Sequence, residues 1–133
     1  MDCPHCGSEL FSYPVPTDLQ AYAPAETAHA ATCRHCLHLE PVGPEDAPAD
    51  LPDFTTLSDA FPEERPTAAA MALLVGLLSS LALHRTAIFA LLERVERDGV
   101  DPLLVLDRLA TDSTLDPETD LATRRTQLLQ LLE

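Results

Sequence analysis

Two short stretches decide the fold of this 133-residue chain: Cys-Pro-His-Cys-Gly at residues 3–7 and Cys-Arg-His-Cys-Leu at residues 33–37. Together they contain all four cysteines, arranged as two Cys-x-x-Cys pairs. Two residues between the cysteines let a tight turn point both sulfurs at one ion, and two such turns complete a tetrahedron with Zn–S bonds of about 2.3 Å. The pattern therefore predicts a four-thiolate Zn²⁺ site with the ligands Cys3, Cys6, Cys33 and Cys36.

The two turns differ at the residue that follows the second cysteine. Gly7 can take the positive φ that the chain needs on leaving the turn, whereas the second turn has Leu37 at that place. We expect the second turn to leave with a different backbone or to accept strain. The 26 residues between Cys6 and Cys33 exceed the roughly 15 to 20 of the usual pattern, which indicates an enlarged loop between the ribbon strands.

Three other uses of the cysteines stay open. A disulfide pair suits a small secreted protein, but no basic and then apolar leader precedes Cys3, so we expect an intracellular, cytoplasmic protein. Iron in a rubredoxin-like site has the same ligands, although only one turn has the Cys-Pro-x-Cys-Gly form. A redox dithiol needs a βαβ unit near one pair, and the sequence contains no such pattern.

Nothing in the sequence indicates catalysis. Four thiolates close the coordination shell, whereas catalytic zinc keeps a position for water. We therefore expect His5 and His35 to face solvent, and we do not expect His5, His35 or His38 to bind the metal. The four glycines do not form a phosphate-binding loop, and no Gly-x-Ser-x-Gly turn is present. The sequence therefore predicts a protein that is not an enzyme.

The charge balance is strongly acidic. The chain has 22 Asp and Glu, eight Arg and no Lys, for a formal net charge of −14. Such a surface repels phosphate backbones, which disfavours direct nucleic-acid binding. Halophilic cytoplasms favour proteins of this acidic, lysine-poor kind, and at about 1 M salt the Debye length falls to about 3 Å. We therefore take the charge as weak evidence about function.

Composition predicts an α+β protein in three parts: a small β zinc ribbon at residues 1–44, a Pro-rich acidic linker at 45–66 and a helical bundle at 67–133. Within the ribbon, residues 9–15, 28–32 and 37–42 read as strands, and residues 19–23 as a short extended piece. So few residues cannot bury a large core, and we expect metal binding to contribute much of the folding free energy of the ribbon.

The linker carries an apolar pattern at helical spacing. Leu51, Phe54, Leu57 and Phe61 recur at intervals of three and four residues, so residues 53–60 could form one or two helical turns. We favour a strap that packs on the following helices over a protruding docking peptide.

Four helices are predicted near residues 67–83, 87–98, 102–111 and 117–132. Thr86, Asp101-Pro102 and Asp116-Pro117 are candidate helix starts, and Gly99 is a stop. Residues 66–83 contain no charge, close to the minimum length of a membrane span. Small residues along one side favour a central core helix over a span, because they let neighbouring elements approach closely.

The chain also resembles a known family. Besides both cysteine turns, the sequences Val-Pro-Thr-Asp-Leu at 15–19, Gly-Leu-Leu at 76–78, Ser-Leu-Ala-Leu at 80–83 and Gly-Val-Asp-Pro-Leu at 99–103 are similar to those of the small CPxCG-type zinc-ribbon proteins of halophilic archaea. That family is of unknown function and has a helical tail. The resemblance implies zinc binding and no established activity.

These observations favour a non-enzymatic zinc protein that acts as a protein-interaction or regulatory adaptor, with an unidentified protein partner and an open oligomeric state. The alternatives are a nucleic-acid-associated accessory factor and a rubredoxin-like iron electron carrier. Arg124-Arg125 is the only adjacent basic pair, and we expect it to counter Asp120 on an exposed helix face or to contact a partner.

Overall fold

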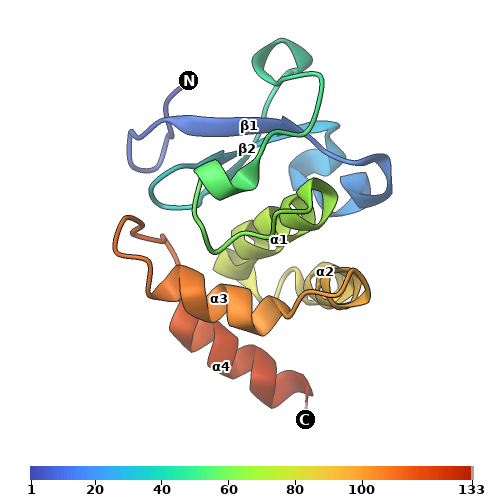
Figure 1. The fold of residues 1–133 in the computed structure, drawn as a ribbon, viewed down its shortest axis with the longest axis vertical. Helices are drawn as coiled ribbons and strands as arrows, with labels where there is room; N and C mark the ends of the chain where they lie inside the picture. The colour runs from blue at the N-terminus through green and yellow to red at the C-terminus, as the bar shows by residue number, and fades with distance from the viewer. Residues whose placement is uncertain (133) are drawn as a thin grey trace.

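The computed structural model describes residues 1–132 and contains one small antiparallel sheet beside four α-helices (Figure 1). The strands are β1 (Leu10–Pro14), β2 (His29–Cys33) and β3 (Leu39–Pro41), in the order β1-β2-β3. Leu10 lies opposite Cys33, and Thr32 opposite Leu39. The second cysteine turn is therefore the loop that connects the end of β2 at Cys33 to the start of β3 at Leu39. The predicted α+β class and the three strands are confirmed in this outline.

The inner face of the sheet is aromatic because β1 alternates between buried and half-buried residues. Phe11 and Tyr13 point inward, and the Tyr13 hydroxyl pairs with the Thr32 hydroxyl at 2.8 Å. Phe54 packs edge-on against both rings, at 5.1 Å from Phe11 and 5.0 Å from Tyr13. Both hydroxyls are thus hydrogen-bonded inside an otherwise apolar core.

Residues 19–23 are not extended, so that prediction is wrong. Thr17–Tyr22 forms a 3-10 helix in which the Leu19 N–H donates to the Pro16 carbonyl at 2.8 Å. This turn buries Leu19, which is 1% exposed. Burial of a leucine outweighs the weak extended preference of a segment that has no neighbouring strand to pair with.

The segment from residue 42 to 64 contains short 3-10 turns at Pro44–Asp46 and Phe54–Thr56. Asp53 caps the second turn by accepting a hydrogen bond from the Thr55 N–H at 3.0 Å. Phe54, Leu57 and Phe61 are buried in the same hydrophobic core as the sheet and the helices. The apolar residues at helical spacing thus face the protein interior.

The four helices are α1 (Arg65–Leu77), α2 (Arg85–Arg97), α3 (Pro102–Ala110) and α4 (Leu121–Leu132). Figure 1 shows the sheet at one end, α1 beneath it, and α4 at the opposite end under α3. From Ala68 to Leu74 every residue of α1 is fully buried. No helix among residues 1–132 is long and apolar enough to cross a membrane.

Helix boundaries follow the local signals at some ends only. Gly99 ends α2 with φ +89°, and the Asp101 carboxylate caps α3 by accepting from the Leu103 and Leu104 N–H groups. Helix α1, however, ends at Leu77 rather than residue 83. Past that point the Leu78 N–H is shared between two carbonyls, and the Ser79 hydroxyl binds the Gly76 carbonyl at 3.1 Å. Thr86 is not a cap either, because α2 begins one residue before it.

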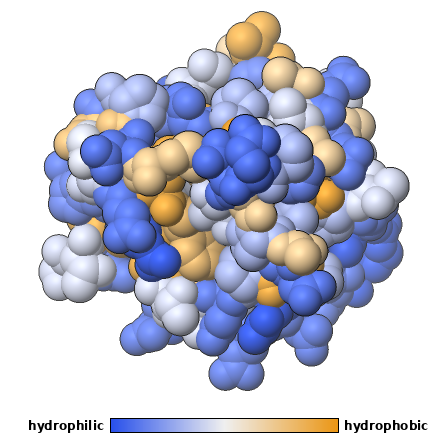
Figure 2. Space-filling model, turned by 90° about the horizontal axis from the view of Figure 1, so that it is seen from above, coloured by the Kyte–Doolittle hydropathy of each residue, from blue (hydrophilic) through white to orange (hydrophobic). Residues whose placement is uncertain are grey.

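Polar contacts tie the elements together at the far edge of the core. The Asp98 carboxylate accepts from the Thr67 hydroxyl at 2.8 Å and from Arg94 Nε at 2.9 Å. Arg94 also pairs with Asp18 in the Thr17–Tyr22 turn. Seen from the sheet end, hydrophilic residues cover most of the surface, with hydrophobic residues between them (Figure 2).

Candidate metal centre

The two cysteine turns have nearly the same backbone hydrogen bonds. In the first, the Cys3 N–H donates to the Ser8 carbonyl at 2.7 Å and the Gly7 N–H to the Cys3 carbonyl at 2.8 Å. In the second, the Cys33 N–H donates to the His38 carbonyl at 2.9 Å and the Leu37 N–H to the Cys33 carbonyl at 3.1 Å. Each turn is therefore closed by the same pair of bonds and presents its sulfurs on one side.

Leu37 resolves the choice between another backbone and strain. Its φ is +62°, close to the +81° of Gly7, so the second turn repeats the first although its residue carries a side chain. A left-handed conformation costs a non-glycine residue about 1–2 kcal/mol. The Leu37 side chain is only 2% exposed, and its burial offsets that cost.

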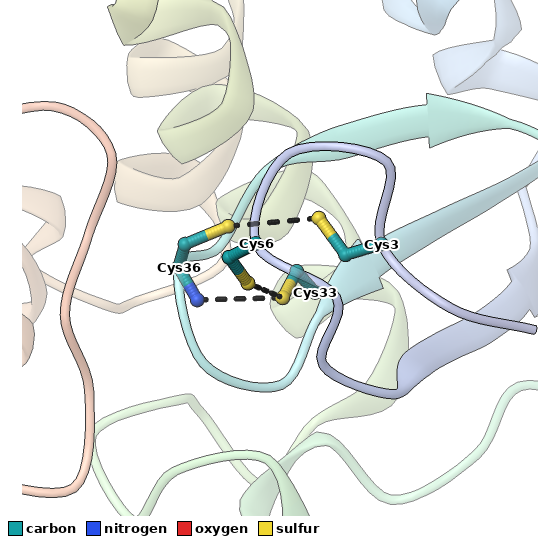
Figure 3. A group of neighbouring side chains, drawn as sticks. All are labelled: Cys3, Cys6, Cys33 and Cys36. Carbon is teal, nitrogen blue, oxygen red and sulfur yellow. Dashed lines mark hydrogen bonds between the residues drawn. The ribbon is translucent and has the colours of Figure 1, made fainter.

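The four sulfurs converge on one point (Figure 3). Their Sγ atoms all lie within 4.8 Å of one another, with Cys3 and Cys36 at 3.8 Å and Cys6 and Cys33 at 3.4 Å. A tetrahedron with metal–sulfur bonds of about 2.3 Å has edges of about 3.8 Å. Disulfide bonds are about 2.05 Å long, and none joins these cysteines. The cluster therefore has the dimensions of a mononuclear tetrathiolate site.

The surroundings of the sulfurs shift the pKa values of the thiols in different directions. Hydrogen bonds from the backbone and hydroxyl of Ser8 lower the pKa of Cys6 to about 6. Burial instead raises the pKa of Cys33 and of Cys36. The His35 and Cys36 N–H groups both donate to the Cys33 sulfur at 3.4 Å, which partly opposes this effect. Full deprotonation of all four sulfurs thus requires a nearby positive charge.

A loop from the far end of the chain closes over the second turn. The Asp116 N–H donates to the His35 carbonyl at 2.8 Å, and the Glu118 N–H to the Cys36 carbonyl at 2.9 Å. These bonds explain why α4 begins at Leu121 and not at Pro117 as predicted. The backbone at 116–118 extends along the cysteine turn, and Asp120 becomes the cap by accepting from the Thr123 N–H at 3.1 Å.

His38 lies between two carboxylates beside the sulfur cluster. Its Nδ1 is 2.8 Å from Glu118 Oε2, and its Nε2 is 2.8 Å from Glu40 Oε1. Burial lowers the pKa of His38, but hydrogen bonds to Glu40 and Glu118 outweigh burial, so the net shift is upward. The His5 ring stacks on His38 with centroids 5.7 Å apart. Both rings line a hollow of about 700 Å³.

The structure brings together the four predicted cysteines and leaves the histidines outside the cluster. His5 and His35 are exposed, and His38 binds carboxylates rather than facing solvent alone. Arg124 and Arg125 lie away from this cluster: Arg124 donates to Gln127 at 2.8 Å, and Arg125 to the Leu103 carbonyl at 3.0 Å. Arg124 does not come within ion-pair distance of Asp120 in residues 1–132. Hydrogen bonds from Thr123 lower the pKa of Asp120, and the charge of Arg124 adds to this effect, as expected for a group that counters Asp120.

Sequence reasoning missed the role of the loop at residues 116–120. Glu118 is 80 residues from His38, and neither residue stands in a recognisable motif. Only the Asp-Pro pair at 116–117 marked the region, and it was interpreted as a helix start. No local signal could have indicated a contact set entirely by tertiary packing.

The comparisons with known proteins identify the family of the chain. The model of a family described as a family of unknown function, DUF6276, matches residues 2–132. Because the match covers nearly the whole sequence, the chain belongs to this family. No curated protein and no solved structure matches it.

Proposed function

We propose that this member of DUF6276 is a non-enzymatic zinc protein that acts as an intracellular protein-interaction or regulatory adaptor. The observation that carries the metal assignment is the convergence of four unbonded sulfurs within 4.8 Å, with spacings close to a tetrahedral edge. Cys3, Cys6, Cys33 and Cys36 would hold the ion, and its charge would offset the burial that disfavours the thiolates of Cys33 and Cys36.

The filled coordination shell supports an adaptor over a catalyst. Four thiolates fill the tetrahedral shell of zinc and leave no position for a substrate or water. The metal would then act structurally, by fixing the two turns against each other and against the loop at residues 116–118. The acidic, lysine-free composition supports a halophilic cytoplasm as the setting, where free cysteines stay reduced.

Metal analysis of the purified protein tests the assignment. We expect one zinc per chain and a colourless solution, and Co²⁺ substitution should give the intense visible bands of a tetrahedral thiolate site. Cys36→Ser should lower the zinc content, while His5→Ala, a change directly beside a ligand, should retain one zinc. A red protein that contains iron instead would support the electron-carrier alternative and contradict the zinc proposal.

Partner capture tests the adaptor part. The full chain should recover a protein in stoichiometric amount from a native lysate at high salt, and nuclease treatment should not change the yield. Recovery that depends on nucleic acid would favour the accessory-factor alternative.

The proposed halophilic setting also predicts that the free energy of unfolding rises between about 0.1 and 2 M KCl, because salt screens the repulsion among 22 carboxylates.

A further inference from the structure

A groove runs between α4 and the segment that joins α1 to α2, at the end of the molecule away from the sheet. Its volume is about 420 Å³. The floor and rim combine apolar and polar side chains from the two segments: Leu81, Arg85, Arg124, Gln127, Gln130 and Leu131. Among residues 1–132, the lining thus has two guanidinium groups, two amides and no carboxylate.

The absence of acids in the lining reflects the sequence around it. Residues 65–92 contain no Asp or Glu, and neither do residues 121–132. These 40 residues hold four of the eight arginines, although the whole chain has 22 acidic residues. Two of these arginines, Arg85 and Arg124, line the groove, so it offers guanidinium groups that can pair with carboxylates at contact distance.

The two arginines of the groove have guanidinium N–H groups that no carboxylate binds within residues 1–132. Within residues 1–132 neither Arg85 nor Arg124 forms an ion pair. Arg85 lies over the Phe89 ring at 5.6 Å, and Arg124 donates to Gln127. The Arg124 Nε–H is shielded from water and finds no acceptor among the described residues. That shielded N–H is out of reach of a ligand, so an incoming carboxylate would pair with the exposed Arg85 guanidinium and with the accessible N–H groups of Arg124.

The apolar part of the surface is also unpartnered. Helix α4 buries only Leu121 and Leu128, and Leu131 and Leu132 stay 37% and 52% exposed. Leu83, next to the groove in sequence, is 78% exposed. The core thus covers only part of the apolar surface of α4, and the exposed Leu131 lies beside the two arginines of the groove.

We propose that this groove binds an acidic amphipathic segment of a partner protein, with an apolar side chain seated between Leu81 and Leu131 and carboxylates paired with Arg85 and Arg124. This inference rests on the adaptor function proposed above and names the class of partner. Charge complementarity identifies the occupant. Apolar contact alone would suit any hydrophobic segment, but the two guanidinium groups, which form no ion pair within residues 1–132, favour carboxylates.

A second copy of the chain fits the groove less well. In a two-fold dimer the same patch meets itself, which would bring Arg85 and Arg124 of one chain against the arginines of the other. A head-to-tail contact could place acidic residues in the groove, but it would repeat into a closed ring or an open fibre. A different protein can fill the groove without either assembly.

Binding of defined peptides to the full, zinc-loaded chain tests the proposal by fluorescence anisotropy. The probe is a labelled 16-residue helical peptide with leucine at every third or fourth position and glutamate elsewhere. Two control peptides replace the glutamates by lysine or place the leucines in scrambled order. We expect only the acidic, regularly spaced peptide to bind, more weakly at about 1 M KCl than at about 0.15 M because the ion pairs are screened.

Variants of the protein locate the site. Arg85→Gln should weaken binding, and Arg85→Gln/Arg124→Gln should weaken it by about three- to tenfold, as expected for two exposed ion pairs. Arg97→Gln removes the same charge from an exposed position outside the groove and should leave the affinity unchanged. Leu131→Ser should also weaken binding, whereas Leu104→Ser, at an exposed leucine elsewhere on the surface, should not. Zinc content and circular dichroism verify that each variant is folded.

Several results would overturn the proposal: no binding of the acidic peptide, equal binding of the lysine peptide, or an equal affinity of the double variant. Binding of phosphatidylglycerol vesicles that depends on Arg85 and Arg124, without peptide binding, would assign the groove to a membrane surface instead. If a lysate partner is still captured by the Arg85→Gln/Arg124→Gln chain, the adaptor function stands and the groove assignment fails.

Discussion

Leu37 occupies a backbone conformation that normally belongs to glycine. Its positive φ closes the second cysteine turn, and its buried side chain packs into the core shared by sheet and helices. Strain and burial act in opposite directions at this one residue. Burial is the larger of the two effects. Burying a leucine contributes about 1.5–3 kcal/mol, whereas the left-handed conformation costs about 1–2 kcal/mol.

Substitutions at Leu37 should therefore follow an unusual order. Leu37→Ala loses the burial and keeps the strain, and should destabilise the protein by about 2–5 kcal/mol. Leu37→Gly loses the burial but relieves the strain, and should be less destabilising than alanine by about 1 kcal/mol. Urea unfolding of the zinc-loaded variants measures both. At Leu19, a buried residue of a right-handed turn, the order should be reversed, and the same order at both positions would contradict this account.

Asp98 is the residue whose ionisation links three parts of the fold. Hydrogen bonds from Thr67 and Arg94 lower its pKa below the ordinary value. A lowered carboxyl pKa contributes stability above the unfolded-state pKa, and that contribution disappears as pH falls through the folded-state pKa. The network should therefore stabilise the protein near neutral pH and lose its effect in acid.

Asp98→Asn should reduce the free energy of unfolding at pH 7 by about 1 kcal/mol, a modest value because the carboxylate is partly exposed. The difference from the wild type should shrink as pH falls below about 4, where the wild-type carboxyl is protonated too. Guanidinium unfolding of both proteins at each pH gives this difference, in which any acid loss of zinc is common to both. A difference independent of pH would refute the assignment.

Among the elements, local signals predicted some boundaries and not others. The C-terminus of α2 and the N-terminus of α3 were predictable, because Gly99 and Asp101 each act within one turn of the helix that they bound. The start of α4 was not, since the bonds from Asp116 and Glu118 to the cysteine turn override the preference of Pro117 for a helix start. The Thr17–Tyr22 turn was also missed, because its cause is the burial of Leu19 against distant elements.

The contact of α1 with β3 depends on a missing side chain. A Cβ on Gly76 would lie 2.4 Å from Leu39 Cβ, so the helix and the strand could not keep their present separation. Gly76 is thus one of the small residues predicted to allow close approach, and the element that approaches it is strand β3. Helix propensity favours alanine over glycine by about 1 kcal/mol, but the steric cost of overpacking is about 1–3 kcal/mol.

Gly76→Ala should therefore be neutral to destabilising by about 2 kcal/mol, despite its better helix propensity. Adding Leu39→Gly should remove the clash, because it deletes the Cβ that alanine would keep. Gly76→Ala should then stabilise in that background, and the double-mutant cycle should show a coupling of about 1–2 kcal/mol. Thermal unfolding of the four proteins provides the measurement. Additive effects would mean that the two elements can separate at no cost.

At the scale of the molecule, the cysteine turns, the loop at residues 112–120 and α4 form one connected path. The four ligands could be read from the sequence because their spacing reflects the geometry of an ion. The connected path could not be predicted from the sequence, because it consists of contacts such as Glu118 to His38 that join residues far apart in the chain. It predicts that loss of the metal is felt in residues 112–120, which are far from the ligands in the sequence but lie against the second cysteine turn.

Removal of the metal by a chelator should increase amide hydrogen exchange in residues 3–10 and 33–39, and also in residues 112–120. Helix α1 should keep most of its protection because its residues are buried among the helices. Exchange followed by mass spectrometry resolves these segments, and added zinc should restore the protection. Unchanged exchange at residues 112–120 would show that the loop docks independently of the metal.

The enclosed phenol of Tyr13 gives the molecule an internal optical reporter. The chain has two tyrosines and no tryptophan, so near-ultraviolet emission comes from Tyr13 and Tyr22 alone. Tyr13 is wholly screened from solvent and touches Phe54 from the segment that crosses the sheet. In a Tyr22→Phe chain, the remaining fluorescence of Tyr13 would report when that segment leaves the sheet, so one intrinsic chromophore could follow assembly of the core without any attached dye.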